Sequence, residues 1–337
     1  MFERAPFWLP GGHVQTIWAA VCAQKRRAVV LPLTRERWTT PDGDFIDVDR
    51  QHARREGRPL LVMFHGLEGS SQSHYAQAFA DWAAEHDVNF AVPHFRGCSG
   101  ELNRAPRAYH SGDHPEIDWI LQRLRREHVA SHGQFLMAVG VSLGGNALMR
   151  WAAEHGTEAQ AAADAVASIC SPLDLALSGQ AIGKGFNRQV YTRMFLRSMK
   201  PKALAKWSQY PGLFDRKRLL EARDLYEFDN VFTAPLHGFK NTDDYWRRAS
   251  AKPLMKNITI PALVLNALND PFVPAHSLPQ AKDVSPWVTL WQPAQGGHVG
   301  FAQGVLPGHV RGLPDAVGGW LMQAVGLTLK RREHVNG

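Results

Sequence analysis

Short hydrophobic runs alternate with segments of helical periodicity along most of the chain. The runs that predict buried strands lie at residues 58–64, 88–93, 135–139, 165–170, 258–266 and 287–291. Helices are predicted at 75–85, 115–126 and 315–329. Because strands that alternate with helices favour parallel pairing, this pattern predicts an α/β fold in which helices cover both faces of a mostly parallel central sheet.

The amino-terminal region departs from this alternation. Residues 27–50 predict a β-hairpin, with strands at 28–33 and 45–48 on either side of a turn at Thr40-Pro-Asp-Gly43. Residues 1–26 show no pattern that assigns a structure, and we treat them as an extension of the core.

The pattern changes again between residues 175 and 250, where strand signals vanish. Prolines 201, 211 and 235 are expected to break this region into separate helices, and aromatic residues are frequent in it. We interpret 175–250 as a helical cap inserted into the sheet domain. The core is then expected in two parts, at 1–174 and 251–337.

The central predicted strand leads into a candidate nucleophile. Gly140-Val-Ser142-Leu-Gly144 follows residues 135–139, and a helical pattern begins at Asn146. A sharp turn between strand and helix holds a serine on strained backbone with its hydroxyl directed away from the sheet, and glycines let strand and helix pass closely. The N–H of Leu143 would lie at a helix N-terminus, where it can donate to an oxyanion. A purely structural glycine-rich turn shows the same pattern, so the interpretation depends on finding a base and an acid.

A second glycine-rich loop, His65-Gly-Leu67-Glu-Gly69, follows the predicted strand at 58–64. The carboxyl ends of parallel strands are where such sheets place their sites. We therefore expect this loop to turn one backbone N–H, that of Leu67, toward Ser142. His65 precedes the nucleophile and adjoins the strand end, so we interpret it as a residue that shapes the loop.

A serine hydroxyl needs a base, and the base needs an acid to orient it. At sites of this kind the acid follows the serine along the chain, and the histidine comes last. Asp270 follows the predicted strand at 258–266 in a loop braced by Pro271 and Pro274. Asp174 is the rival acid, and a turn-forming role for the Asp-Pro pair is the structural alternative.

The chain has 16 histidines, of which His298 is the best placed as the base. It lies in a glycine-rich loop directly after the last predicted strand, where it can fold back over Ser142. His276 precedes that strand, His334 lies in a basic tail, and His309 lies further along the chain.

Composition narrows the class of protein and its compartment. The 337 residues are 45% hydrophobic and 20% charged, as in ordinary globular proteins. The three cysteines are far apart and form no C-x-x-C pair, so we expect a reducing compartment and a cytoplasmic location. No apolar run is long enough to span a membrane, and the first residues do not resemble a secretion signal. Metal-binding and nucleotide-binding motifs are absent from the sequence, so no metal or cofactor is expected.

Positive charge is concentrated in the predicted cap. The net charge is +7, and residues 184–256 alone hold 16 Lys and Arg against 7 Asp and Glu, an excess of 9. A solvated helical face would account for this charge. The functional interpretation is attraction to anionic substrates, or peripheral contact with an acidic lipid surface. The sequence holds no nucleic-acid-binding module, so nucleic acid is not an expected partner.

Taken together, these motifs resemble the α/β-hydrolase superfamily and, within it, the YheT-like branch of esterases. The resemblance spans nearly the whole chain, through residues 12–17, 65–71, 95–104, 109–112, 140–146, 245–250, 269–271 and 297–298. It implies a triad of Ser142, Asp270 and His298, a cap over the site, and hydrolysis of carboxylic esters. Asn269 stands where the branch usually has an acidic residue, but Asp270 itself is present.

The predicted activity is hydrolysis of small-molecule carboxylic esters with apolar, short- to medium-chain acyl groups, through an acyl-enzyme. In the predicted mechanism, His298 accepts the proton of Ser142, and Asp270 orients His298. The backbone N–H groups of Leu67 and Leu143 hold the oxyanion. An acyltransferase or thioesterase with the same triad is the enzymatic alternative. A hydrolase-fold binding protein with an idle triad is the non-enzymatic one. The sequence does not indicate the oligomeric state.

Overall fold

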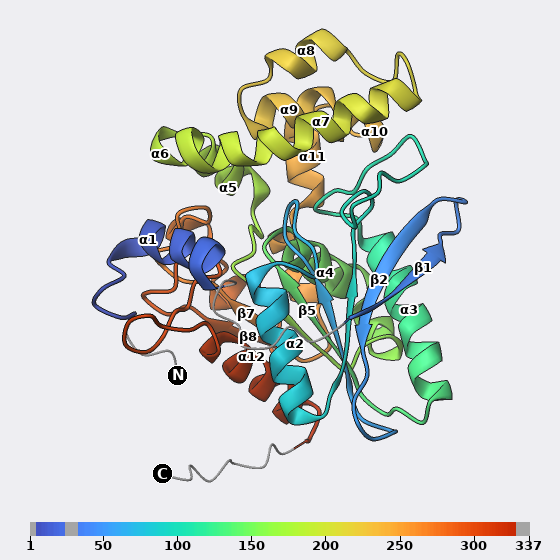
Figure 1. The fold of residues 1–337 in the computed structure, drawn as a ribbon, viewed down its shortest axis with the longest axis vertical. Coiled ribbons are helices and arrows are strands. Elements are labelled where there is room, and N and C mark those ends of the chain that lie inside the picture. Colours follow the sequence, from blue (N-terminus) through green and yellow to red (C-terminus); the bar gives the residue numbers. More distant parts are fainter. Residues whose placement is uncertain (1–4, 24–32, 328–337) are drawn as a thin grey trace.

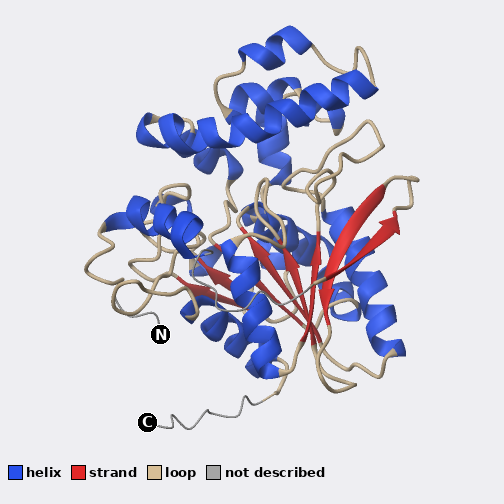
Figure 2. Cartoon of the chain, viewed as in Figure 1, coloured by secondary structure: helices blue, strands red, loops and turns tan. Residues whose placement is uncertain are grey.

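The computed structural model describes residues 5–23 and 33–327, which fold around one twisted eight-stranded sheet (Figures 1 and 2). The strands lie in the order β1-β2-β4-β3-β5-β6-β7-β8. Their bounds are β1 Thr34–Thr39, β2 Phe45–Gln51, β3 Leu60–Phe64, β4 Asn89–Pro93, β5 Leu136–Val141, β6 Ala165–Ile169, β7 Ala262–Leu265 and β8 Val288–Trp291. Strand β2 is antiparallel to β1 and β4, and all pairs from β4 to β8 are parallel. The predicted mostly parallel sheet is therefore confirmed.

The hairpin forms around the predicted turn, but its first strand lies later than expected. Most of the predicted strand at 28–33 falls outside the described residues, and β1 begins at Thr34. Side chains of β1 alternate between the two faces of the sheet, which explains why a strand forms here. Trp38 is buried on one face, while Arg35 and Arg37 contact the carboxylates of Asp49 and Asp47 on the neighbouring strand. Such cross-strand pairs stabilise an antiparallel edge without a continuous apolar run.

Helices cover both faces of the sheet, as the alternating pattern predicts (Figure 2). On one face, α2 (His74–His86) and α12 (Gly312–Ala324) pack on Met63 and Val139. On the other, α3 (His114–Ala130) and α4 (Leu143–His155) pack on Val62 and Ala138. Consecutive residues of the central strands β3 and β5 thus enter opposite cores, which is why these two strands are apolar throughout.

All regular structure described between residues 175 and 249 is helical, and it stands together beyond the carboxyl edge of the sheet (Figure 1). The bounds are α5 Leu175–Ile182, α6 Gly185–Asn187, η4 Arg188–Thr192, α7 Arg193–Gln209, α8 Arg216–Glu221, α9 Leu225–Val231, α10 Thr233–Leu236 and α11 Thr242–Ala249. Leu196, Phe214, Leu219 and Phe228 share a separate hydrophobic cluster within this region. We therefore propose that 175–250 form an inserted cap on a core made of 1–174 and 251–337.

One expectation for this region is wrong, because α7 runs through Pro201 without a break. A proline inside a helix removes one backbone hydrogen bond. Leu196 and Ala203 lie seven residues apart on the same face, one on each side of the proline, and both are buried in the cap cluster. Tertiary packing thus holds the helix on both sides of the missing bond. Pro211 does follow the end of α7, and Pro235 lies in the first turn of α10, where its missing N–H breaks no helical bond.

Part of the amino-terminal region that had no predicted structure is helical in the described residues. Helix α1 (Gly11–Trp18) continues into a π-helical segment, η1 (Ala19–Ala23). Leu9, Trp18 and Ala302 pack together in a small cluster of their own. Four short 3-10 segments complete the described structure: η3 Gly156–Ala161, η5 Lys252–Asn257, η6 Ala275–Ser277 and η7 Ala281–Asp283. Across the described ranges, no helix combines the length and apolar character needed to traverse a bilayer.

Candidate active site

Ser142 occupies the sharp turn between β5 and α4. Its backbone is strained, with φ at 53° and ψ at −119°, a conformation that non-glycine residues rarely adopt. The glycines around it are required by close packing. A Cβ on Gly140 would lie 2.5 Å from the carbonyl oxygen of Gly144, and one on Gly144 would lie 2.4 Å from that of Phe64. The motif thus produces the strand–turn–helix geometry expected from the sequence.

The structure brings together the three residues predicted to form a triad. His298 Nδ1 lies 2.8 Å from Asp270 Oδ2, and His298 Nε2 lies 3.0 Å from Ser142 Oγ. With its proton on Nδ1, the imidazole donates to the carboxylate and can accept the serine proton at Nε2. This is the arrangement required of a nucleophile, a base and an orienting acid.

The carboxylate of Asp270 is held on both oxygens. Its side chain is fully buried, and Oδ1 accepts hydrogen bonds from the backbone N–H groups of Phe272 at 2.7 Å and Val273 at 3.3 Å. Oδ2 is therefore left to His298. The rival acid, Asp174, caps α5 instead by accepting from the N–H of Leu177.

The other histidines considered as bases are engaged elsewhere or are exposed. His276 in η6 and His309 are both exposed, and His309 pairs with Gln303 through backbone atoms only; His334 lies outside the described residues. His65 is fully buried: its Nε2 accepts from the N–H of Phe95, and its Nδ1 donates to the carbonyl of Gly66. Burial lowers the pKa of His65 to about 3, so it stays neutral and shapes the loop.

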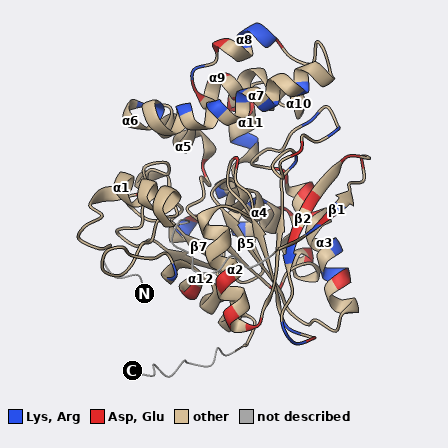
Figure 3. Ribbon diagram, in the orientation of Figure 1, with Lys and Arg blue, Asp and Glu red and all other residues tan. Residues whose placement is uncertain are grey.

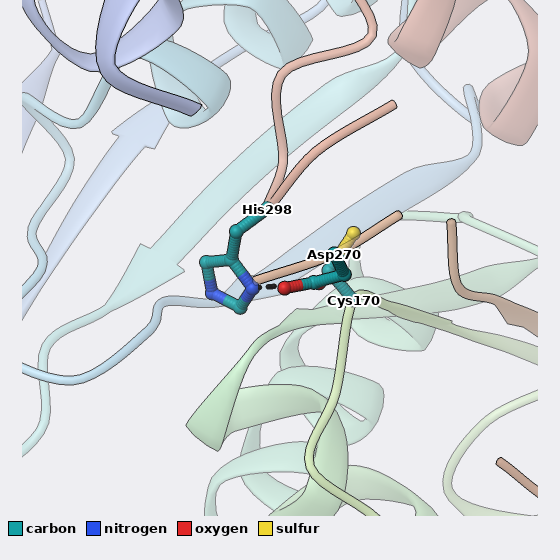
Figure 4. Close-up of side chains that lie close together, drawn as sticks. All are labelled: Cys170, Asp270 and His298. Atoms are coloured by element: carbon teal, nitrogen blue, oxygen red, sulfur yellow. Dashed lines mark hydrogen bonds and ion pairs between the residues drawn. The ribbon is translucent and has the colours of Figure 1, made fainter. Parts of the chain in front are cut away.

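Sequence reasoning missed Cys170, which lies next to Asp270, on the side away from the His298 ring (Figure 4). Its Sγ donates to the carbonyl of Gly297 at 3.6 Å and accepts from the N–H of Val299 at 3.3 Å. One ligand-type atom from each of Cys170, Asp270 and His298 falls within 4.8 Å of the others, a spacing that could hold a metal ion. Burial raises the pKa of the Cys170 thiol well above its usual value, which disfavours the thiolate that a metal binds. The hydrogen bonds of Cys170 to the histidine loop and of Asp270 to His298 account for the positions of these three side chains.

The backbone N–H groups of Leu67 and Leu143, which are predicted to bind the oxyanion, are not used by the hydrogen bonds around them. The N–H of Gly66 donates to Tyr75 Oη at 2.8 Å, and that of Glu68 donates to Tyr109 Oη at 3.0 Å. Between them, the N–H of Leu67 has no acceptor among the described residues. Leu143 is the first residue of α4, so its N–H has no partner within the helix.

A cavity of about 160 Å³ opens between the core and the cap at Ser142 and His298. Its cap side is mainly apolar and includes Phe195, Met199, Ala203, Leu225, Phe228 and Phe232. Charged groups also line the cavity: the carboxyls of Glu68 and Asp229, and Lys202 and Lys206 of α7. Asp229 accepts hydrogen bonds from Thr233 Oγ1 and Trp246 Nε1. Burial raises the pKa of Asp229 to about 6.

Comparison with known proteins agrees with this fold. A family profile described as "alpha/beta hydrolase fold" matches residues 59–305. The chain belongs to the α/β-hydrolase family. Within the family it is 37% identical over 313 residues to "Putative esterase YheT" of Escherichia coli (strain K12), an alignment that covers 92% of this chain and 89% of that protein. The YheT-like branch expected from the sequence is therefore confirmed.

Similarity extends to a more distant relative and, at the level of the fold, to solved structures. The mouse protein named Phospholipase ABHD3 is 27% identical over 251 residues, which are 74% of this chain and 60% of that protein. The structure of the Pyrococcus furiosus esterase Pf2001 superposes with a TM-score of 0.54 at 14% identity, over 86% of this chain and 92% of the other. At that identity the likeness concerns the fold.

Proposed function

We propose that this α/β hydrolase cleaves carboxylic esters through a covalent acyl-enzyme on Ser142. The observation that carries the proposal is the hydrogen-bonded line from Asp270 through His298 to Ser142 Oγ, at 2.8 and 3.0 Å, at the mouth of an apolar cavity. The names of the relatives support the reaction class, since they include an esterase and a phospholipase.

The proposed mechanism follows from this geometry. As Ser142 Oγ attacks the ester carbonyl, its proton passes to His298 Nε2, and Asp270 stabilises the imidazolium through Nδ1. The negative charge that develops on the carbonyl oxygen is held by the N–H groups of Leu67 and Leu143. His298 then protonates the departing alcohol. In the second half of the reaction it accepts a proton from water, which attacks the acyl-enzyme and releases the acid.

The cavity sets the expected length of the acyl group. A buried apolar cavity of roughly 150 Å³ accommodates benzene, a ligand of six carbon atoms. The cavity at Ser142 has about 160 Å³ and a mainly apolar cap side. We therefore propose uncharged substrates with acyl chains of up to about six carbons, within the short- to medium-chain class.

An ester panel tests this proposal. p-Nitrophenyl esters from acetate to dodecanoate are assayed with the wild type and with Ser142→Ala, which removes only the attacking oxygen. We expect turnover to be highest between butyrate and hexanoate and to be abolished in the variant. Turnover that survives in Ser142→Ala, or that is highest with dodecanoate, contradicts the proposal. Adding methanol to the same assay distinguishes acyl transfer from hydrolysis, because transfer produces a methyl ester.

The charge of the cap supports a second part of the proposal, peripheral contact with an anionic lipid surface. Lys and Arg positions, blue in Figure 3, are spread over α7 and α8. Those that are exposed include Arg193, Arg197, Arg216, Lys217 and Arg218. Each basic group near an anionic membrane contributes about 1 kcal/mol to binding. Co-sedimentation with phosphatidylserine vesicles at low salt, but not with phosphatidylcholine vesicles, is the expected result. Equal binding to both contradicts it.

A further inference from the structure

Helix α1 lies beside the loops of the carboxyl-terminal part of the chain, which are orange and red in Figure 1. Two of its side chains, Gln15 and Thr16, are buried even though they are polar. Buried polar groups are normally hydrogen-bonded, so the question is which groups they hold. Both reach the loop that carries His298.

Four consecutive backbone N–H groups of this loop donate to side chains, and none of the four belongs to a helix or strand. The pairs are Gly296 N with Gln15 Oε1 at 3.0 Å, Gly297 N with Asn269 Oδ1 at 2.9 Å, His298 N with Thr16 Oγ1 at 2.8 Å, and Val299 N with Cys170 Sγ at 3.3 Å. Two of the four acceptors come from α1. The one on Thr16 binds the backbone N–H of the proposed base itself.

The loop depends on these side chains because its own conformation is unfavourable. Gly297 and Val299, on either side of His298, have φ values of 59° and 58°. The left-handed region costs a β-branched residue such as valine free energy, and such backbone persists only where its surroundings hold it. No sheet or helix ladder satisfies these N–H groups, so the side-chain acceptors do so.

Helix α1 also contacts the acid loop. The amide of Asn269 donates to Gln15 Oε1 at 3.0 Å, next to Asp270 in the chain. The backbones approach so closely that a Cβ on Gly12 would lie 1.9 Å from the carbonyl oxygen of Asn269, and one on Gly300 would lie 2.7 Å from that of Gln15. The helix therefore fixes the loops of the acid and the base relative to each other.

We propose that α1 is part of the catalytic apparatus, with Thr16 and Gln15 as positioning residues for His298. The inference rests on the proposed function, because it assigns these residues a role through the base. A small displacement of a catalytic group lowers the rate of the chemical step much more than it weakens substrate binding. Loss of the Thr16 acceptor should therefore lower kcat and leave KM nearly unchanged.

The experiment compares Thr16→Val, which is isosteric and lacks the acceptor, with Thr16→Ser, which keeps it. Thr242→Val is the matched control. Both threonine hydroxyls donate to a backbone carbonyl, that of Thr16 to Gly12 at 2.7 Å and that of Thr242 to Tyr226 at 2.8 Å, but only Thr16 also accepts from the histidine loop. Gln15→Met, of similar length and without an acceptor, is the second test variant. Steady-state kinetics on a butyrate ester, thermal unfolding and the downfield proton resonance of the His298 Nδ1–H are measured for each.

We expect kcat to fall about tenfold in Thr16→Val and Gln15→Met, with KM within about twofold of the wild type, and to recover to at least half in Thr16→Ser. The downfield resonance should broaden or vanish in the first two variants and persist in Thr16→Ser and Thr242→Val. The inference is overturned if Thr16→Val keeps its kcat within twofold. It is equally overturned if Thr242→Val loses as much kcat as Thr16→Val at equal loss of stability. A wild type without Ser142-dependent turnover refutes the proposed function instead, and the proton resonance then still decides whether α1 positions His298.

Discussion

Substitution of Asp229 by asparagine should stabilise the protein at neutral pH but not in acid. Asp229 is a buried carboxyl in the wall of the cavity, with Thr233 and Trp246 as its hydrogen-bond donors. Burial is the main cause of its raised pKa, about 6 against an ordinary value of 3.8, and the two hydrogen bonds oppose the increase only in part. Asparagine keeps the shape of the side chain and an acceptor for Trp246, but it cannot ionise.

The magnitude follows from the shift. A carboxyl whose pKa is higher in the folded state binds its proton more tightly there, so its contribution to stability is fully present below pH 3.8 and is lost as the pH rises through 6. At 1.36 kcal/mol per pKa unit, the wild type loses less than about 1 kcal/mol by pH 4 and about 3 kcal/mol by pH 7.5. The stability difference between Asp229→Asn and wild type should therefore increase by about 2–3 kcal/mol between these two pH values.

Urea unfolding of both proteins at several pH values between 4 and 7.5 measures this difference. The other titrating groups are common to both proteins and cancel. The same charge should also matter to substrate, because an ionised Asp229 faces an apolar acyl group. The KM of the wild type for a butyrate ester, divided by that of Asp229→Asn, should rise above pH 6. A stability difference that does not vary with pH would refute the assignment of Asp229 as a buried group that ionises at a cost.

Three further outcomes are expected. Burial lowers the pKa of His74 to about 4, so the stability that this residue contributes above pH 6.5 is lost as the pH falls. In urea unfolding at pH 5, His74→Gln should therefore lose about 2 kcal/mol less of its stability than the wild type does. Equal loss of stability in acid by the two proteins contradicts this prediction. In Gly145→Ala the added Cβ would lie 1.9 Å from Ser171 Oγ and 2.7 Å from the carbonyl oxygen of Gly140. Thermal unfolding should therefore show that the free energy of unfolding falls by about 1–3 kcal/mol. An unchanged Tm contradicts the close packing at this glycine. Ala203→Phe fills the cavity from α7, so on the ester panel hexanoate turnover should fall at least tenfold relative to acetate, and an unchanged ratio places the acyl chain elsewhere.

The sequence predicts the parts of this molecule whose signals are local. Ser142 is identified by five residues between a strand and a helix, and Asp270 and His298 by loops that directly follow strands. Parallel strands bring their carboxyl ends to one edge of the sheet, so chain order and strand position suffice to bring these three side chains together. The N–H groups of Leu67 and Leu143 follow from the same loops.

The parts that depend on distant contacts could not be predicted. Gln15 and Thr16 contact a loop more than 280 residues along the chain, and no periodicity near them indicates it. Cys170 has a left-handed backbone, with φ at 50°, and its contact with Val299 forms only when β6 lies beside the histidine loop. Pro201 shows that distant contacts can also override a local signal. The sequence predicts a helix break at this proline, but packing around Leu196 and Ala203 keeps α7 continuous.

The most direct test of the central claim, that His298 and Asp270 activate Ser142 as a nucleophile, is active-site labelling. The wild type, Ser142→Ala and His298→Gln are treated with a fluorophosphonate, and the intact proteins and their peptides are weighed by mass spectrometry. The account predicts one adduct per wild-type chain on the peptide that contains Ser142, none in Ser142→Ala, and labelling at least a hundredfold slower in His298→Gln. Labelling of Ser142→Ala at the wild-type rate, or a wild type that does not react, would contradict it.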